Sequence, residues 1–303
     1  MKRASRVRVA LRRGLVRPEI LFLRRLVSDS TLGLDASARH VLRDLCVSNR
    51  SIYGDRFYEL RVFWHVSYLR SFLFFVRYGW PFSQRLKDSL YTGFDGRTNP
   101  EKLKSAYEEA AFHYSIFLML SMHRGEWLLP FLADTQDNLP KDCSPRILEY
   151  GCGVSDMGLI LASRGCDVSI ADLSDKKLEF AEWRYKVRRL RCTTIPVVNT
   201  ETIPDIPQAA FDVVIVSEVL EHVRDPLQLL KVLTNALRPR GLLFCTAGGK
   251  IERELEGDHL IEAIAIGNSR EYMDYFKSNY ESLSEKPGMP FLFIRRKQEA
   301  NLQ

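Results

Sequence analysis

The strongest constraint on the fold is a stretch of 27 residues, Arg146–Asp172, that reads as strand, glycine turn, helix and second strand. The first apolar strand runs into two glycines one residue apart, Gly151 and Gly153. Without a Cβ, these positions allow a tight backbone turn and the close approach of a ligand. The second apolar run ends on Asp172, 21 positions after Gly151, about where such units place an acid on ribose hydroxyls. The stretch therefore predicts one mononucleotide-binding half of an α/β sheet.

The start of the helix in this unit indicates which nucleotide it holds. Ser155 or Asp156 is the predicted helix cap. A dinucleotide fingerprint has glycine three places after its second glycine, and Asp156 occupies that place here. A carboxylate at a helix N-terminus opposes a pyrophosphate, which that end of a helix otherwise attracts. The sequence thus disfavours NAD and favours a ligand with ribose but no phosphate.

A continuous apolar strand at Phe211–Val216 predicts a sheet with helices on both faces. Open parallel sheets bind ligands beyond the carboxyl ends of the strands, where the strand order reverses. This rule places Ser217 and Glu218 at the reaction centre. Further strands are expected at Thr193–Val198, Leu242–Thr246, 281–284 and 291–296. Helices are expected at 174–191 and 225–237, with Ser174 and Asp225 as their caps, and at 259–280.

Three segments, Glu149–Gly153, Asp172 and Phe211–Val223, together resemble class I S-adenosylmethionine-dependent methyltransferases. The resemblance is to the group that includes quinone-biosynthesis and other small-molecule methyltransferases, and it covers about residues 146–249. It implies S-adenosyl-L-methionine as the cofactor. It also implies an α/β, Rossmann-like, doubly wound and mostly parallel sheet of seven strands with an antiparallel last strand, preceded here by an N-terminal helical region.

The resemblance and the strand ends together give a set of expected cofactor contacts. Asn199 and Thr200 follow the third strand, where the family contacts the adenine ring. Ser155 stands where the family often has a third glycine. The full set of expected cofactor-binding residues is Glu149, Gly151, Gly153, Asp172, Leu173, Asn199, Thr200 and Ser217.

The expected reaction moves a methyl group from a sulfonium to an acceptor. Alignment supplies much of the rate of such an in-line displacement, so few chemical groups are needed. For a hydroxyl acceptor, His222 is the candidate general base, with Glu218 as the second candidate catalytic residue. The alternative that His222 only packs or hydrogen-bonds in its turn stays open.

A metal site is a separate hypothesis for the same segment. Glu218, Glu221 and His222 stand at positions i, i+3 and i+4, which lie on one side of a helical turn. Two carboxylates and an imidazole suit a divalent metal that acidifies a substrate hydroxyl. Some similar quinone-pathway and small-RNA-terminus methyltransferases use a Glu-x-x-Glu-His of this kind, and His259 is a candidate further ligand. Non-metal relatives share the Glu-His pair, so no metal is expected and the set is kept as the alternative.

The chain is expected to divide into three parts: a basic amphipathic arm at 1–27, a helical lid or substrate region at 28–140, and an S-adenosylmethionine-binding methyltransferase domain at 141–303. The arm holds nine Lys or Arg and one acid. A solvated arm, a membrane-surface helix and an organelle transit peptide all fit it. Aromatic residues crowd 53–82, which fits either a helical core or a lid that closes over substrate.

Composition narrows the class of partner. The net charge of the chain is +6, but outside the arm 35 basic and 37 acidic residues remain, which argues against a nucleic-acid surface. The six cysteines form no Cys-x-x-Cys pair, so we expect a reducing, cytoplasmic compartment and no zinc site built on cysteine. Arg70 and Arg77 interrupt the apolar stretch 62–82, which argues against a membrane span. Peripheral membrane contact through the arm stays open.

The leading functional interpretation is methylation of an oxygen on a small molecule, with a sugar, a lipid-linked compound or a phenol as acceptor. A non-catalytic scaffold that binds S-adenosylmethionine is the alternative, and an RNA methyltransferase is a weaker one. Nitrogen and carbon acceptors stay open, as does the oligomeric state. The intact Gly151, Gly153 and Asp172 favour retained cofactor binding in each case.

Overall fold

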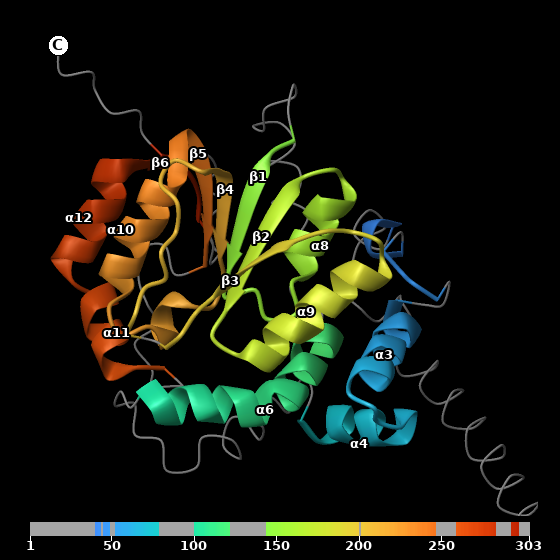
Figure 1. Cartoon of the computed structure of the whole chain (residues 1–303). Coiled ribbons are helices and arrows are strands. Elements are labelled where there is room, and N and C mark those ends of the chain that lie inside the picture. Colours follow the sequence, from blue (N-terminus) through green and yellow to red (C-terminus); the bar gives the residue numbers. More distant parts are fainter. Residues whose placement is uncertain are drawn as a thin grey trace, which may run out of the picture.

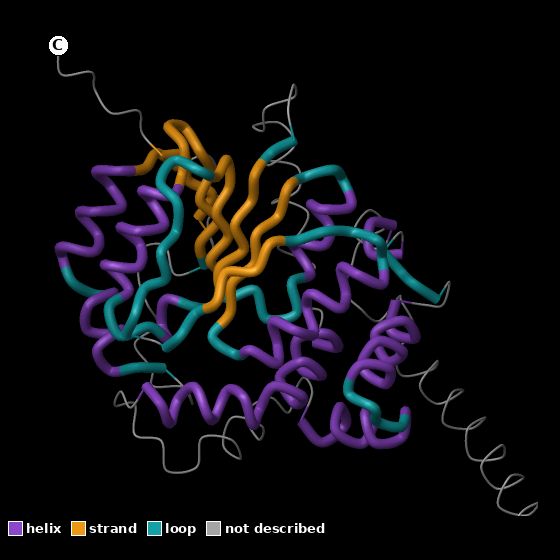
Figure 2. Tube along the Cα trace, viewed as in Figure 1, coloured by secondary structure: helices purple, strands orange, loops and turns teal. Residues whose placement is uncertain are grey.

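The computed structural model describes residues 40–43, 45–48, 52–78, 100–121, 144–199, 201–246, 259–282 and 292–296. In this part of the chain a central sheet forms the middle layer, and helices lie on both sides of it (Figure 1, Figure 2). The strands are β1 (Arg146–Tyr150), β2 (Asp167–Asp172), β3 (Thr193–Pro196), β4 (Phe211–Val216), β5 (Leu237–Cys245), β6 (Tyr280–Ser282) and β7 (Leu292–Arg296). The helices are α3 (Ile52–Phe63), α4 (Tyr68–Tyr78), α6 (Pro100–Ser121), α8 (Asp156–Ser163), α9 (Asp175–Val187), the short 3₁₀ helix η2 (Leu220–His222), α10 (Pro226–Ala236), α11 (Ile261–Gly267) and α12 (Arg270–Asn279).

The strands lie in the order β3-β2-β1-β4-β5-β7-β6. Strands β1 to β5 pair in parallel, whereas β7 pairs antiparallel with both β5 and β6. The chain moves outward from β1 to β2 and β3 and then returns to β4 on the other side of β1. The crevice beyond the carboxyl ends of β1 and β4 is therefore the expected ligand site of this sheet. The predicted Rossmann-like α/β fold with a parallel sheet is confirmed.

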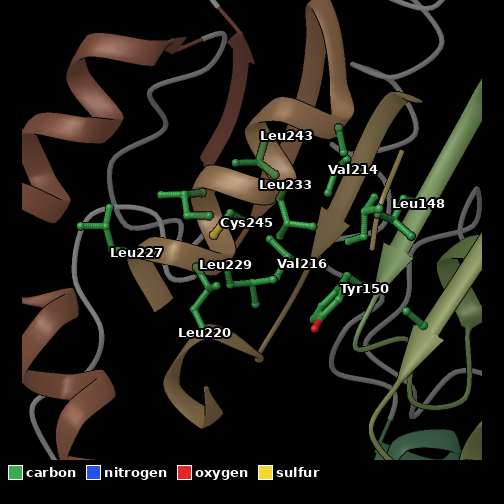
Figure 3. Packing of buried hydrophobic residues seen from close by; sticks show 14 of the residues in the cluster. Leu148, Tyr150, Val214, Val216, Leu220, Leu227, Leu229, Leu233, Leu243 and Cys245 are labelled. Atoms are coloured by element: carbon green, nitrogen blue, oxygen red, sulfur yellow. The ribbon is translucent and has the colours of Figure 1, made fainter. Parts of the chain in front are cut away.

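Alternate side chains of the central strands enter two different cores. Leu148 and Val214 pack with residues of β5 and α10 on one face (Figure 3). Ile147 and Val213 pack with residues of α8 and α9 on the other face. Full burial of each such side chain contributes roughly 1.5–3 kcal/mol. All of β4 is buried, as predicted for a strand with helices on both faces.

Capping side chains set the starts of the helices that follow β2 and β4. Ser174 Oγ accepts a hydrogen bond from the Lys177 N–H at the start of α9. Asp225 Oδ1 accepts one from the Gln228 N–H at 2.8 Å, and Pro226 occupies the first turn of α10, where its missing N–H costs nothing. Both caps were predicted from the sequence.

Several predicted boundaries are wrong. The helix expected at 259–280 is two helices, α11 and α12, because Ser269 caps the second and interrupts the first. The helix expected at 174–191 ends at Val187, and Arg189 beyond it has a positive φ of 58°. The strand expected from Leu242 begins at Leu237, with an irregularity in its pairing to β4.

The described aromatic residues of the predicted lid form a packed core. Phe63 and Trp64 lie with their ring centroids 4.9 and 5.9 Å from that of Phe180 in α9. The other buried members of this core are Phe57, Leu60, Ile116, Met119 and Val154. Packing therefore accounts for Phe57 and Phe63 of α3 and for Trp64 in the turn that follows it.

A buried network of charges joins α3 to α8 and α9. Glu59 of α3 is 0% exposed and accepts hydrogen bonds from Arg184 of α9 and from Arg188, which directly follows α9. Arg184 also pairs with Asp156 of α8 at 2.9 Å, and Asp156 pairs with Arg56 of α3 at 2.9 Å. Burial alone raises the pKa of Glu59, but Arg184, Arg188 and Arg56 together outweigh burial and hold this pKa below its ordinary value. The network fixes α3 to the sheet domain.

Two predictions lie wholly outside the described residues: the basic arm 1–27 and the cofactor contact Thr200. Much of the predicted lid region 28–140 also lies outside them. Among the helices that the structure describes, none has the length and apolar character needed to cross a membrane.

Candidate active site

The glycine turn after β1 has the backbone geometry that its sequence predicts. Gly151 and Gly153 have φ angles of 69° and 56°, in the left-handed region that side chains disfavour. A Cβ on Gly151 would lie 2.2 Å from Val219 Cγ2, and a Cβ on Gly153 would lie 2.8 Å from Leu118 Cδ1 of α6. The turn therefore lies in close contact with the segment after β4 and with α6, and both of its glycines are required.

Asp172 ends β2 with its carboxylate turned toward this glycine turn. Its side chain is buried, and Oδ2 accepts a hydrogen bond from the Gly153 N–H at 2.8 Å. Oδ1 accepts from the Ser174 N–H at 2.9 Å and pairs with Lys177 Nζ at 3.1 Å. The structure thus brings the predicted glycine and the predicted acid together at the carboxyl edge of the sheet.

Glu149, near the end of β1, forms hydrogen bonds with residues that follow the glycine turn. Its Oε2 accepts hydrogen bonds from Ser155 Oγ and from the Gly158 N–H, the latter at 3.1 Å. A Cβ on Gly158 would lie 2.4 Å from the Tyr185 hydroxyl and 2.5 Å from Glu149 Oε2. Sequence reasoning missed Gly158 and Tyr185, although a glycine inside a predicted helix was an available signal. The role of Glu149 in binding the cofactor stays a prediction.

Ser155 has a φ of 53°, which explains why glycine suits this position in the family that the chain resembles. Asp156, the next residue, bears on the sequence argument against NAD. Its carboxylate is paired with Arg56 and Arg184. Burial raises its pKa, but the two arginines outweigh burial and lower it to about 2. Because the arginines neutralise this acid, its charge gives no argument against a pyrophosphate, and that step of the reasoning was wrong.

The residues after β2 and β3 that were expected to contact the cofactor have other contacts in the structure. Asn199 Oδ1 accepts hydrogen bonds from the N–H groups of Glu201 and Thr202, at 2.9 and 2.6 Å. Leu173 is half-buried and packs against the core of Figure 3. The contact of Asn199 with the adenine ring and that of Leu173 with the cofactor stay predictions.

Ser217 and Glu218 follow β4 directly. Ser217 is buried, and its Oγ has no hydrogen-bond partner among the described residues. Since buried hydroxyls normally find a partner, this oxygen suits a ligand contact. The Glu218 side chain is exposed, its φ is 55°, and its N–H donates to Thr246 Oγ1 at 2.7 Å.

The expectation that Glu218, Glu221 and His222 share one side of a helical turn is wrong. The 3₁₀ helix η2 begins only at Leu220, and the left-handed backbone at Glu218 precedes it. The structure instead brings His259 to this place: oxygen and nitrogen atoms of Glu221, His222 and His259 all lie within 4.8 Å of one another. His222 Nε2 is 3.7 Å from Glu221 Oε1, and the rings of His222 and His259 have centroids 5.1 Å apart.

Two protonated groups flank Asp172. Burial, followed by the charge of Asp172, raises the pKa of the Tyr150 hydroxyl and of the Cys152 thiol. Both groups therefore stay neutral at physiological pH. A thiolate nucleophile at Cys152 is not expected, because the thiol needs the opposite shift.

Helix α6 lies along the edge of the sheet at which the parallel strands end (Figure 1). Its Glu108 accepts hydrogen bonds from the first N–H groups of α9, at Asp175 and Lys176. Tyr107 of α6 is buried, and its ring centroid lies 6.4 Å from that of His222. Lys177 Nζ lies 4.8 Å from the Tyr107 ring centroid. Helix α6 therefore reaches both the Asp172 side and the His222 side of the crevice.

The doubly wound sheet, the glycine turn and the acid after β2 define a class I S-adenosylmethionine-dependent methyltransferase domain. In agreement, residues 148–243 match a family model described as a methyltransferase domain. The matched residues run from β1 to β5 and include the turn, Asp172 and the η2 segment. S-adenosyl-L-methionine is the cofactor of this class, as the resemblance implied.

Curated relatives agree with this assignment over about a third of the chain. The ubiquinone biosynthesis O-methyltransferase of Idiomarina loihiensis is 34% identical over 99 residues, which are 33% of this chain and 40% of the relative. The enzyme with the same name from Cereibacter sphaeroides is 37% identical over 103 residues, 33% of this chain and 40% of the relative. The chain thus spans about two fifths of the length of these relatives.

A crystal structure of an S-adenosylmethionine-dependent methyltransferase from Mesorhizobium loti is 17% identical, with a TM-score of 0.38. It covers 54% of this chain and 96% of that chain.

Proposed function

We propose that this protein transfers the methyl group of S-adenosylmethionine to a hydroxyl oxygen of a small molecule, with a sugar, a lipid-linked compound or a phenol as the acceptor. The observation that carries the proposal is the buried Asp172 carboxylate, hydrogen-bonded to the N–H of Gly153 at the carboxyl end of β2. The names of the curated relatives, which are O-methyltransferases, support oxygen as the acceptor atom.

The site residues fit this cofactor. The positive φ angles of Gly151 and Gly153 turn the backbone sharply at the switch point between β1 and β4, where a ligand approaches it closely. The Asp172 carboxylate accepts hydrogen bonds from the ribose hydroxyls, and the Ser217 hydroxyl supplies a further polar contact with the cofactor. When bound, the cofactor supplies an electrophilic methyl group on a sulfonium.

His222 removes the proton of the acceptor hydroxyl in this proposal. Its imidazole is partly exposed, with a side-chain exposure of 18%, so an acceptor proton reaches it. Glu221 Oε1 lies 3.7 Å from Nε2, so its charge attracts the imidazolium that proton transfer would produce. His222 thus accepts the proton while the site holds the acceptor in line with the methyl group.

We expect purified protein to transfer labelled methyl from S-adenosylmethionine into a host extract, with the label in a small-molecule fraction. His222→Gln should lower the rate by a factor of about 10²–10⁴, the usual contribution of a general base. His65→Asn is the matched control, because His65 is exposed in the turn after α3, and it should leave the rate unchanged.

Three results would contradict parts of this proposal. Cofactor binding measured by calorimetry without any transfer would support the scaffold alternative. Label in the RNA fraction would support an RNA methyltransferase. Transfer that is unchanged in His222→Gln would remove the general base from the mechanism.

The cluster of Glu221, His222 and His259 supports a second candidate mechanism that uses a metal. One carboxylate and two imidazoles with ligand atoms within 4.8 Å of one another suit a divalent transition metal better than magnesium. These three residues would hold the ion. When bound, a divalent ion lowers the pKa of a hydroxyl that it contacts.

This second candidate predicts that EDTA followed by gel filtration abolishes methyl transfer and that Zn²⁺ or Mn²⁺ restores it. Equilibrium dialysis should then find one ion per chain in the wild type and none in His259→Ala, while His65→Asn retains the ion. Transfer that survives EDTA unchanged would exclude the metal and leave His222 as the base.

A further inference from the structure

Lys177 is a buried cation that the proposed function does not use. It lies at the start of α9, is 6% exposed, and pairs with Asp172 at 3.1 Å. Its ammonium also lies over two rings of α6, 4.8 Å from the centroid of Tyr107 and 5.6 Å from that of Tyr114. The carboxylate expected to bind ribose is therefore already bound by a lysine that contacts helix α6.

The hydrogen-bonding capacity of Asp172 makes this arrangement significant. An ionised carboxylate offers about four lone-pair sites. Three donors occupy them here: the N–H of Gly153 on Oδ2, and the N–H of Ser174 with the ammonium of Lys177 on Oδ1. A ribose diol that donates from both hydroxyls needs two sites. One of the present donors must therefore move when the cofactor binds.

Of these three donors, Lys177 is the one that can move. The N–H of Gly153 is fixed by the glycine turn, and the N–H of Ser174 by the start of α9. The lysine side chain has a flexible stem, and the rings of Tyr107 and Tyr114 offer its charge a second site without exposure to water. Attraction to an aromatic face strengthens when the cation is desolvated.

We propose that Lys177 competes with the cofactor ribose for Asp172 and passes to Tyr107 and Tyr114 when the cofactor binds, so that this lysine sets the affinity of the site and couples it to α6. The inference rests on the proposed function, because it assumes that Asp172 receives the ribose. Lys177 is a positioning residue in this scheme and takes no part in the chemical step.

The test is the affinity of S-adenosylmethionine and of S-adenosylhomocysteine, measured by calorimetry on the full chain. Lys177→Met should bind both ligands about tenfold more tightly, because a hydrogen bond to a charged group that binding now breaks is absent. Both ligands should gain equally, since they share the ribose. A purely structural role for Lys177 predicts the opposite sign, because losing a buried partner of Asp172 would weaken the site.

Lys176→Met is the matched control. Lys176 is the exposed neighbour, and its Nζ contacts the Glu108 carbonyl oxygen of α6 and is not paired with Asp172. Its affinity for both ligands should stay within about twofold of the wild type. If Lys177→Met does not fold, Lys177→Gln keeps a polar side chain without the charge and should show a smaller gain of the same sign.

The outcomes separate this inference from the proposed function. A wild type that binds both ligands, together with weaker or unchanged binding in Lys177→Met and Lys177→Gln, overturns the role of Lys177 alone. A wild type that binds neither ligand overturns both proposals. Tighter binding in Lys177→Met that disappears in the Asp172→Asn background supports direct competition at that carboxylate.

Discussion

Asp172→Asn is expected to weaken S-adenosylmethionine binding about 100-fold while the domain stays folded. An amide keeps one oxygen, which still accepts a hydrogen bond from the N–H of Gly153. Its NH₂ group cannot accept a hydrogen bond from a ribose hydroxyl. Hydrogen bonds to a charged acceptor contribute about 1.5–3 kcal/mol, and a factor of 100 corresponds to about 2.7 kcal/mol. Calorimetry with the purified variant measures this loss.

Asp167→Asn is the control for that experiment. Asp167 is exposed at the other end of the same strand, β2, so the same chemical change there should leave the affinity within about twofold. An Asp172→Asn variant that retains the wild-type affinity would show that the ribose is bound elsewhere, and the proposed cofactor geometry would then be abandoned.

Glu59→Gln is expected to lower the free energy of unfolding by about 3–5 kcal/mol. Glu59 is 0% exposed and accepts hydrogen bonds from both Arg184 and Arg188. Removing its charge leaves two buried guanidinium groups short of a carboxylate, which costs more than the loss of an exposed ion pair. Urea unfolding at pH 7 measures the change.

The control is Glu179→Gln, because Glu179 is exposed on α9, the helix that holds Arg184 and ends just before Arg188. Its unfolding free energy should differ from that of the wild type by less than about 0.5 kcal/mol. A loss of unfolding free energy of similar size in both variants would mean that the buried Glu59 network contributes no more to stability than an exposed carboxylate does.

The same replacement should change how stability depends on pH. The pKa of Glu59 lies below its ordinary value because the charges of Arg184, Arg188 and Arg56 together outweigh the effect of burial. Its contribution is therefore fully present above about pH 4.3, the ordinary glutamate value, and is lost as pH falls through the lowered value. The gap between the wild type and Glu59→Gln should be widest near neutral pH and should narrow in acid.

The parts of the fold that were predicted correctly depend on local signals. Gly151, Gly153 and Asp172 lie within one strand-turn-helix-strand unit, and their spacing is fixed by the lengths of those elements. The strand β4 is recognisable because four consecutive apolar residues, Val213–Val216, suit burial on both faces of a sheet. The caps Ser174 and Asp225 act on N–H groups three residues away, so they too can be read from the sequence.

The parts that were missed depend on contacts between distant segments. Asp156 was expected to repel an anion, but Arg56, a hundred residues earlier in the chain, pairs with it. The approach of His259 to His222 depends on how the chain returns after β5, which no local pattern specifies. The burial of Lys177 against Tyr107 depends on the position of α6, which no local pattern around Lys177 specifies.

The backbone at Glu218 was missed for a different reason. Spacing at i, i+3 and i+4 indicates a shared face only if the segment is helical. Here the chain leaves β4 through a left-handed residue before η2 begins. Non-glycine residues adopt that conformation uncommonly, so a helical turn was the reasonable expectation at this position.

The charge network described above also limits how this protein can diverge. Arg184 and Arg188 lie in the sheet domain, whereas the Glu59 that neutralises them lies in the preceding helices. An exchange of those helices for a set from another protein would remove Glu59 from both arginines and Asp55 from Arg188, unless compensating changes arose in the sheet domain at the same time. The amino-terminal helices and the methyltransferase domain are therefore expected to be inherited together rather than recombined as separate modules.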